Sequence, residues 1–280
     1  MVLEELVDLA MLEKRTWELG FLGFFWTIFS GALSLFLFPE FSSLLTVTFI
    51  VILTLPFVYK IISEEEHHYD EGWGEKSLLR AHAHTFSCFL WLFLGILVGY
   101  IAWFSLAPQG VVDILFQAQT DTITTINGPT GSIISQDMFL RIFWHNTRIM
   151  LVSILLAFFL GAGPIFILAW NASVIAAALG NLLNNEVQVI LAAGGDLGWG
   201  ESLSGLLFPF YRYLVHGIPE ILAYIIAGLA GGIISVAVIR HHFKKDHLYR
   251  SMADASTLLT LAVLLLLVAA FIEVKILAQL

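Results

Sequence analysis

Three side chains that could do chemistry follow one another along a single predicted helix. His216, Glu220 and Tyr224 are spaced at intervals of four residues, which places them on one helical face. Pro219 fits the first turn of such a helix, where its missing N–H is not needed. The largely apolar stretch 206–215 comes before it, and an ionisable group set deep among apolar residues is a functional candidate. The alternative is a first-turn carboxylate near an interface, held by the helix dipole.

A second polar group lies earlier in the chain. Arg141, His145 and Arg148 share one face of a predicted helix, at spacings of four and three residues. One interpretation is an interfacial helix whose arginines reach lipid phosphates. The other is that Arg148 pairs inside the protein with Glu220 or Glu186, because charges within a membrane usually find partners.

We consider these residues together as one candidate polar cluster, although no catalytic residue, metal ligand or cofactor is assigned. Its members are His216, Glu220, Tyr224, Arg141, His145, Asn146, Arg148, Asn171, Glu186 and Glu273. Glu273 lies near the end of the last apolar run, where a charge that reaches back to the surface is the alternative. Zinc-protease, serine-hydrolase, nucleotide-loop and kinase motifs are all missing from the sequence. The chain is therefore more consistent with a protein that is not an enzyme.

The composition fixes the environment in which these side chains work. Of 280 residues, 59% are hydrophobic and 12% are charged, whereas soluble domains carry about 25% charged residues. Such a chain cannot cover its apolar surface, so the excess must face a lipid bilayer. We predict an all-α polytopic bundle of about six or seven spans, forming a single transmembrane domain over residues 1–280. The net charge of −9 and the lack of a basic stripe exclude nucleic acid as an expected partner.

Six apolar runs are long enough to cross a bilayer. They are Gly20–Phe38, Phe41–Tyr59, Phe86–Ala107, Ile149–Trp170, Ile218–Ile239 and a run from Leu258 through Glu273. The fourth and fifth runs would enter from the same side, so the chain between them has to return once. Either Asn171–Ala193, interrupted at Asn184, Asn185 and Glu186, or Leu203–Val215, broken by Pro209, provides the return. We therefore predict re-entrant or broken helices in the central region.

The distribution of basic residues predicts the orientation. Lysine and arginine occur before the first run, in 60–80 and in 240–250, but not in 108–140. By the positive-inside rule, the N-terminus is cytoplasmic and 108–140 is external, in the plasma membrane. Residues 1–18 are amphipathic and predict a helix on the cytoplasmic surface. Residues 63–85 predict a polar cytoplasmic loop.

Small residues predict where the helices pack closely. Gly228 and Gly232 form a G-x-x-x-G pair, which lets a neighbouring helix approach. The full predicted packing set is Gly228, Gly231, Gly232, Gly161, Gly163 and Pro164. Faces of this kind are also compatible with a homo-oligomer.

Three blocks within residues 136–280 carry a resemblance to a known family. The first runs from Asn146 through Gly161-Ala-Gly163-Pro164 and Asn171 to Gly180; the second is His216-Gly-Ile-Pro-Glu220 with its glycine-rich continuation; the third is Ala-Ala-Phe-Ile-Glu273. They resemble the stage II sporulation protein M family of integral membrane proteins. The usual Asn-Gly after the fourth span is Asn171-Ala172 here, and residues 1–135 are left without an alignment to the family.

The resemblance implies a multi-span helical domain and a scaffolding role. The namesake gathers cell-wall-remodelling enzymes at the membrane during engulfment, so membrane or envelope proteins are the expected partners besides lipid. Two alternatives stay open. One is a transporter or channel lined by polar residues of the cluster. The other is an intramembrane metal-dependent hydrolase that uses His216, Glu220 and His145 as ligands.

Overall fold

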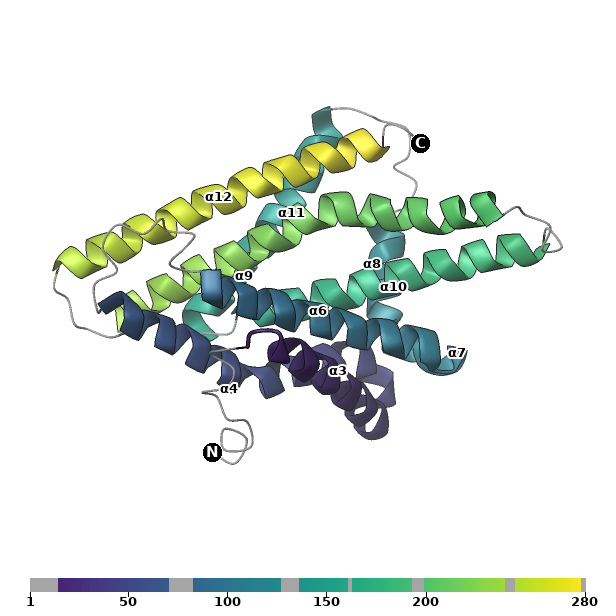
Figure 1. The fold of residues 1–280 in the computed structure, drawn as a ribbon, viewed down its shortest axis with the longest axis horizontal. Coiled ribbons are helices and arrows are strands. Elements are labelled where there is room, and N and C mark those ends of the chain that lie inside the picture. Colours follow the sequence, from purple (N-terminus) through teal and green to yellow (C-terminus); the bar gives the residue numbers. More distant parts are fainter. Residues whose placement is uncertain are drawn as a thin grey trace.

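A computed structural model of the chain is helical along nearly all of the residues that it describes (Figure 1). These residues are 15–70, 83–126, 136–160, 163–192, 199–239 and 245–277. The helices are α3 (Glu18–Leu37), the 3-10 turn η1 (Pro39–Phe41), α4 (Ser42–Asp70), α6 (Ala83–Leu106), α7 (Gln109–Leu115), α8 (Gln117–Ile126), α9 (Gln136–Leu160), α10 (Gly163–Ala192), α11 (Trp199–Ile239) and α12 (Lys245–Leu277). The described part of the chain contains no strand. The predicted all-α bundle is confirmed.

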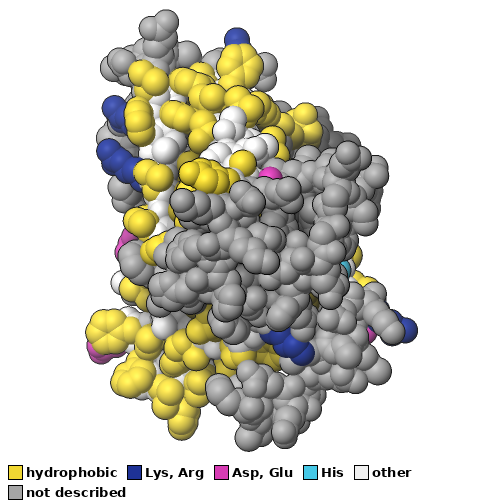
Figure 2. All heavy atoms as spheres, turned by 90° about the vertical axis from the view of Figure 1, so that its left-hand side faces the viewer, with side chains coloured by type: hydrophobic (Ala, Val, Ile, Leu, Met, Phe, Trp, Pro, Cys, Tyr) yellow, Lys and Arg dark blue, Asp and Glu magenta, His cyan; other side chains and the backbone are white. Residues whose placement is uncertain are grey.

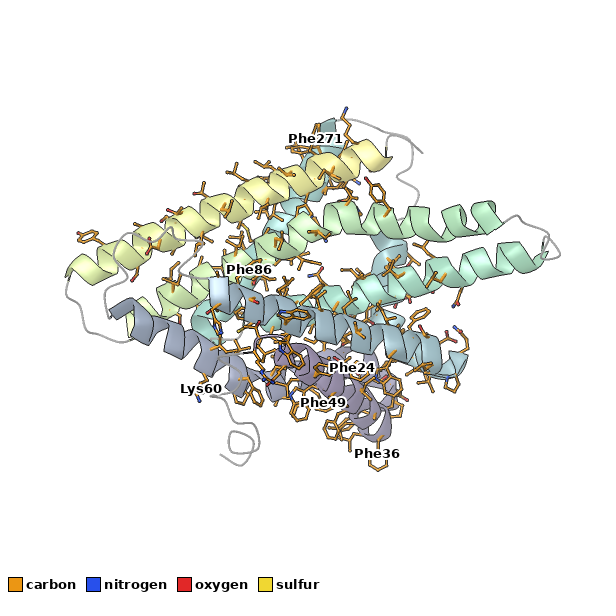
Figure 3. The ribbon with its side chains drawn as sticks, viewed as in Figure 1. Phe24, Phe36, Phe49, Lys60, Phe86 and Phe271 are labelled. Atoms are coloured by element: carbon orange, nitrogen blue, oxygen red, sulfur yellow. The ribbon has the colours of Figure 1, made fainter. Side chains whose placement is uncertain are left out.

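Seven of the described helical segments are long and apolar enough to cross a bilayer. They are Glu18–Leu37, Pro39–Val58, Ala83–Leu106, Met138–Phe158, Ile165–Asn184, Val215–Ser235 and Ser251–Lys275. Among the described residues, the face shown in Figure 2 carries mainly hydrophobic side chains with isolated charges between them. Large apolar side chains also point away from the bundle, as Phe36 and Phe271 do in Figure 3. A surface of this kind matches lipid rather than water.

The single span predicted for Ile149–Trp170 is wrong. Helix α9 ends at Leu160 and a second helix, α10, begins at Gly163. Two apolar helices thus follow each other almost without interruption, and a hydropathy window reads them as one. The chain also contains a signal for the boundary, because proline fits the first turn of a helix and Pro164 is the second residue of α10.

The prediction of broken or re-entrant helices is also wrong for α10 and α11. Helix α10 provides the return crossing and continues without interruption through Asn184 and Asn185 to Ala192. These polar residues lie at or beyond the end of the span at Asn184, where water can solvate them. Helix α11 likewise continues through Pro209, which precedes the span that begins at Val215.

The predicted peripheral elements are only partly described. Residues 1–14 of the surface helix predicted for 1–18 lie outside the described residues. The predicted loop 63–85 is helical at its start, since α4 extends to Asp70, and helical again from Ala83.

Helices α3 and α6 pack through small residues. The buried face of α3 carries Gly23, Thr27 and Gly31, whereas Phe21 and Phe25 are exposed on its other side. A Cβ atom on Gly23 would lie 2.7 Å from the backbone oxygen of Leu92 on α6. Lipid gives large apolar side chains no reason to point inward, so small residues that allow close backbone approach occupy the interface.

Several of the hydroxyl groups inside these spans form hydrogen bonds within the bundle. The Thr27 hydroxyl donates to the carbonyl oxygen of Gly23, one turn earlier, at 2.8 Å. Between α3 and α4, the hydroxyls of Ser34 and Thr46 share a hydrogen bond of 2.6 Å. Such bonds let polar side chains remain at depths where water cannot solvate them.

The C-terminal half forms a second packed unit. Helices α11 and α12 lie side by side along much of their length (Figure 1) and form the most extensive helix pair. Helix α9 packs on α11, and a Cβ atom on Gly231 would lie 2.8 Å from the Cβ of Ala157 and 3.0 Å from the carbonyl oxygen of Ile154. The Ser235 hydroxyl fastens the same pair by donating to the carbonyl oxygen of Phe158 at 2.7 Å.

We expect alanine to have opposite effects at two glycines of α11. Gly231→Ala pushes α9 away and should lower stability by about 1 kcal/mol, toward the low end for overpacked cores. Gly217→Ala is the matched control, because nothing lies within 4 Å of a Cβ there. It should be neutral or gain up to about 1 kcal/mol from helix propensity. Thermal unfolding of both variants in detergent checks the contrast, and equal shifts would place Gly231 on a lipid-facing surface.

Candidate functional site

The first part of the candidate site is a hydrogen-bonded pair on α11. The Tyr224 hydroxyl donates to Oε1 of Glu220 at 2.6 Å. Tyr224 is fully buried, with 0% of its surface exposed, and Glu220 is half-buried. The predicted spacing of four residues therefore brings the carboxylate and the phenol together.

Four helices meet around the Tyr224 side chain. It belongs to an apolar cluster with Met150 of α9, Ile167 of α10 and Leu266 of α12. Apolar neighbours on these helices cannot hydrogen-bond to the phenol, which makes the carboxylate one turn away an important acceptor. The Glu220–Tyr224 hydrogen bond thus lies at the junction of the C-terminal helices.

A second carboxylate approaches from α12. Glu273 is half-buried and lies close enough to Tyr224 to act on it electrostatically. His216 lies one turn before Glu220 on α11 and is also half-buried. Glu220 thus contacts the phenol directly, and Glu273 on a second helix lies within electrostatic range of it, an arrangement that can share protons or attract a cation. Among the described residues, no group of three or more His, Cys, Asp or Glu could hold a metal ion.

The basic residues of the predicted cluster lie elsewhere. Arg141, His145 and Arg148 are exposed on α9, on the side opposite the buried Asn146. Within the described part of the chain, neither arginine forms an ion pair with Glu220. The predicted pairing of Arg148 with Glu220 does not occur, because the helix that carries the arginine turns this face outward. The side chain of Glu186 lies outside the described residues.

The two asparagines of the cluster are on the inner faces of their helices. Asn171 donates from Nδ2 to the carbonyl oxygen of Ile167 on its own helix at 2.8 Å. Asn146 is 5% exposed on α9. Both lie next to the apolar cluster in sequence, since Ile167 and Met150 belong to it, but no hydrogen bond connects either asparagine to Glu220 among the described residues.

The predicted packing residues fall into two groups. Gly228, Gly231 and Gly232 are buried on α11, and a Cβ atom on Gly231 would lie against Ala157 and Ile154 of α9. Gly163 and Pro164 are the first two residues of α10. Gly161 lies outside the described residues.

Sequence reasoning missed a buried amide outside this cluster. Gln119 of α8 is 0% exposed and donates from Nε2 to the Ser173 hydroxyl of α10 at 3.0 Å and, more weakly, to the Ser43 carbonyl of α4 at 3.5 Å. It thereby fixes α8 against two spans. A signal was present, since Val112, Leu115, Phe116 and Gln119 recur at helical spacing. The polar composition of 108–140 masked it.

Comparison with known proteins adds one finding. Neither a curated protein nor a solved structure matches the chain. The family model of stage II sporulation protein M (SpoIIM) matches residues 87–276. The match begins in α6, well before residue 136, so the family domain contains five of the seven spans and both carboxylates beside Tyr224. The chain therefore belongs to the stage II sporulation protein M family.

Proposed function

We propose that this protein is an integral membrane scaffold or assembly subunit that gathers other membrane or envelope proteins. One observation supports this role above the others. The acidic and the basic side chains of the spans do not converge: Glu220 and Tyr224 are joined inside the bundle, whereas Arg141 and Arg148 lie on its outside. Outward-facing charges suit contacts with partners better than they suit a conduit through the chain.

The tight packing of the bundle favours the same role. Helices α3 and α6, and also α9 and α11, approach so closely that added methyl groups would overlap with backbone or side-chain atoms. A transporter needs packed helices that separate and close again, whereas a scaffold needs a fixed surface. Membership in the family agrees with this role, since its namesake gathers envelope enzymes.

Transport is the second candidate, and the pair of acidic residues beside Tyr224 favours it. A half-buried carboxylate in a span is typical of proton and cation pathways. Purified protein in liposomes with an internal pH-sensitive dye would reveal proton flux. Flux that Glu220→Gln abolishes would support transport and count against the scaffold proposal.

The hydrolase alternative has no described ligand set, since His145 is exposed on α9.

The scaffold proposal is tested in native membranes. The tagged chain is extracted into lipid nanodiscs from the membranes of its source, and the copurified proteins are quantified by mass spectrometry. We expect at least one membrane or envelope protein in a fixed ratio to the chain. Glu220→Gln should leave that ratio unchanged, because the pair is internal. Recovery of the chain alone at several expression levels would overturn the proposal.

The orientation proposed for the bundle follows from the basic residues and the number of crossings. Seven spans put the two termini on opposite sides, so a cytoplasmic N-terminus implies an external C-terminus and an external α8. Thr124 is exposed on α8.

We expect Thr124→Cys, in a Cys88→Ser background, to react with a membrane-impermeant maleimide in intact cells. The control is a cysteine at Lys60, which follows the second span and should react only after the membrane is opened. Labelling of the two positions in the reverse order would invert the topology.

A further inference from the structure

The exposed face of α9 carries an arginine, Arg148, at the middle of the helix, where its charge is costly in lipid. Helix α9 runs from Gln136 to Leu160, and Arg148 lies at its midpoint. At 1.5 Å per residue, about 18 Å of helix lies on each side of Arg148, which places this residue near the middle of a bilayer core of about 30 Å. An arginine side chain is too short to reach the headgroups from there, and a charge at the centre of the core is costly.

The two sides of α9 differ sharply. Asn146, Met150 and Ser153 are buried against the bundle, whereas Arg148, Leu151 and Leu155 face outward. Only 17% of the α9 span is buried, the smallest share among the seven candidate spans. The bundle itself therefore leaves the side of α9 with Arg148 uncovered.

The outward side has the composition of an interface rather than of a lipid-facing surface. We define the α9 outer face by eight exposed side chains, Leu140, Arg141, Trp144, His145, Arg148, Leu151, Val152 and Leu155. Apolar groups surround a basic centre, and no described carboxylate forms an ion pair with either arginine. A group that covers this face has to bring a negative charge to the middle of the membrane.

From this arrangement we infer that the α9 outer face docks a transmembrane helix of another protein, which carries a carboxylate at mid-membrane depth. The inference rests on the proposed scaffold function and names its partner by chemistry. An arginine and a carboxylate that meet in a low dielectric form a charge-assisted hydrogen bond, often with two contacts. Each charge then offsets the free-energy cost of placing the other in the middle of the membrane.

Symmetry argues against a second copy of this chain. A twofold dimer through α9 brings the same surface of each copy together, so Arg148 would lie against Arg148 of the partner copy. Like charges that face each other without water are strongly unfavourable. The described carboxylates of the C-terminal spans, Glu220 and Glu273, lie on other helices, α11 and α12, where they act on Tyr224. The charge on the α9 outer face thus selects a different, acidic helix.

The test measures binding of designed helices to the full-length chain in nanodiscs. The probes are 23-residue Leu/Ala transmembrane peptides with a central Glu, Gln or Leu, and energy transfer from a dye on the chain reports their binding. We expect the Glu peptide to bind at least about tenfold more tightly than the Gln and Leu peptides. Arg148→Gln should abolish this preference, and Arg15→Gln, at an exposed arginine before the first span, should retain it.

A charge reversal and a stability measurement keep the test decisive. The Arg148→Glu variant should no longer bind the Glu peptide preferentially, and it should instead prefer a peptide with a central Lys. Arg148→Gln should keep the thermal stability of the parent chain, because the side chain is exposed. A stability loss would show that Arg148 serves the fold of its own chain and would overturn the inference. Equal binding of all peptides, or energy transfer between two copies that depends on Arg148, would overturn it too.

The native nanodiscs separate two outcomes: loss of the docking role of the α9 outer face, and loss of the scaffold role of the whole protein. If native nanodiscs contain a partner in a fixed ratio that Arg148→Gln leaves unchanged, the scaffold proposal stands and the α9 outer face is not its docking site. If the chain is recovered alone, the scaffold proposal fails, whatever the designed peptides do.

Discussion

Replacing Gly95 with alanine is expected to destabilise the bundle more strongly than the same substitution at Gly23 or Gly231. A Cβ atom at Gly95 would overlap with the backbone O, C and Cα atoms of Gly20 on α3. Backbone atoms of a packed helix cannot move aside as the end of a flexible side chain can. We expect a loss of about 3 kcal/mol, the upper end of the range for overpacked cores. Unfolding by heat or by SDS titration, in one detergent, gives the measurement.

Gly110→Ala is the matched control for this substitution. Gly110 also lies in a helix, but nothing lies within 4 Å of a Cβ there, so its stability should change by less than about 0.5 kcal/mol. If both variants unfold together with the parent chain, helices α3 and α6 are not in close contact and the arrangement of the first three spans is incorrect.

The same contact shows what the sequence could and could not predict about the N-terminal spans. Apolar runs near Gly20–Phe38 and Phe86–Ala107 predicted both helices, and the structure places them at Glu18–Leu37 and Ala83–Leu106. Hydropathy measures only affinity for lipid, so it could not show that Gly20 meets Gly95. That pairing depends on which faces meet, and a single sequence contains many glycines that are compatible with packing.

The central spans were harder because two signals conflicted. Arg141 and Arg148 lower the hydropathy of the first half of α9, while apolar residues continue from Ile149 across the start of α10. A hydropathy reading therefore shifted the span toward Trp170 and missed the helix boundary before Pro164. When α9 and α10 are counted as two spans, the chain has seven crossings, and no broken helix is needed to return it to the other side of the membrane.

The candidate site was predictable where it depends on one helix and not where it depends on several. Helical spacing alone brought Glu220 next to Tyr224. The approach of Glu273 depends on how α12 packs on α11, and the outward turn of Arg148 depends on which side of α9 meets the bundle. These are tertiary relations, and the assumption that charges in a span pair with each other failed for Arg148 and Glu220.

Glu220→Leu is expected to lower the free energy of unfolding far more than Glu220→Gln, because only the leucine removes the acceptor of the Tyr224 hydroxyl. Tyr224 is fully buried and donates to Glu220 at 2.6 Å. Leucine removes the acceptor, and a buried donor left unsatisfied costs about 1–3 kcal/mol. Glutamine keeps a side-chain carbonyl oxygen at the same distance from the backbone, so we expect a loss below about 1 kcal/mol for this neutral–neutral bond.

A double-mutant cycle with Tyr224→Phe isolates the hydrogen bond. Phenylalanine removes the hydroxyl and keeps the aromatic ring within the apolar cluster that also contains Met150 and Leu266. In the Tyr224→Phe background, Glu220→Leu leaves no tyrosine donor unsatisfied. It should therefore lower the free energy of unfolding less than it does in the parent chain, with a coupling energy of about 0.5–3 kcal/mol. Unfolding midpoints of the four proteins in one detergent provide the cycle. A coupling energy of zero would mean that the bond contributes nothing to the junction of α11 with α9, α10 and α12, and equal losses for Gln and Leu would contradict its role as acceptor.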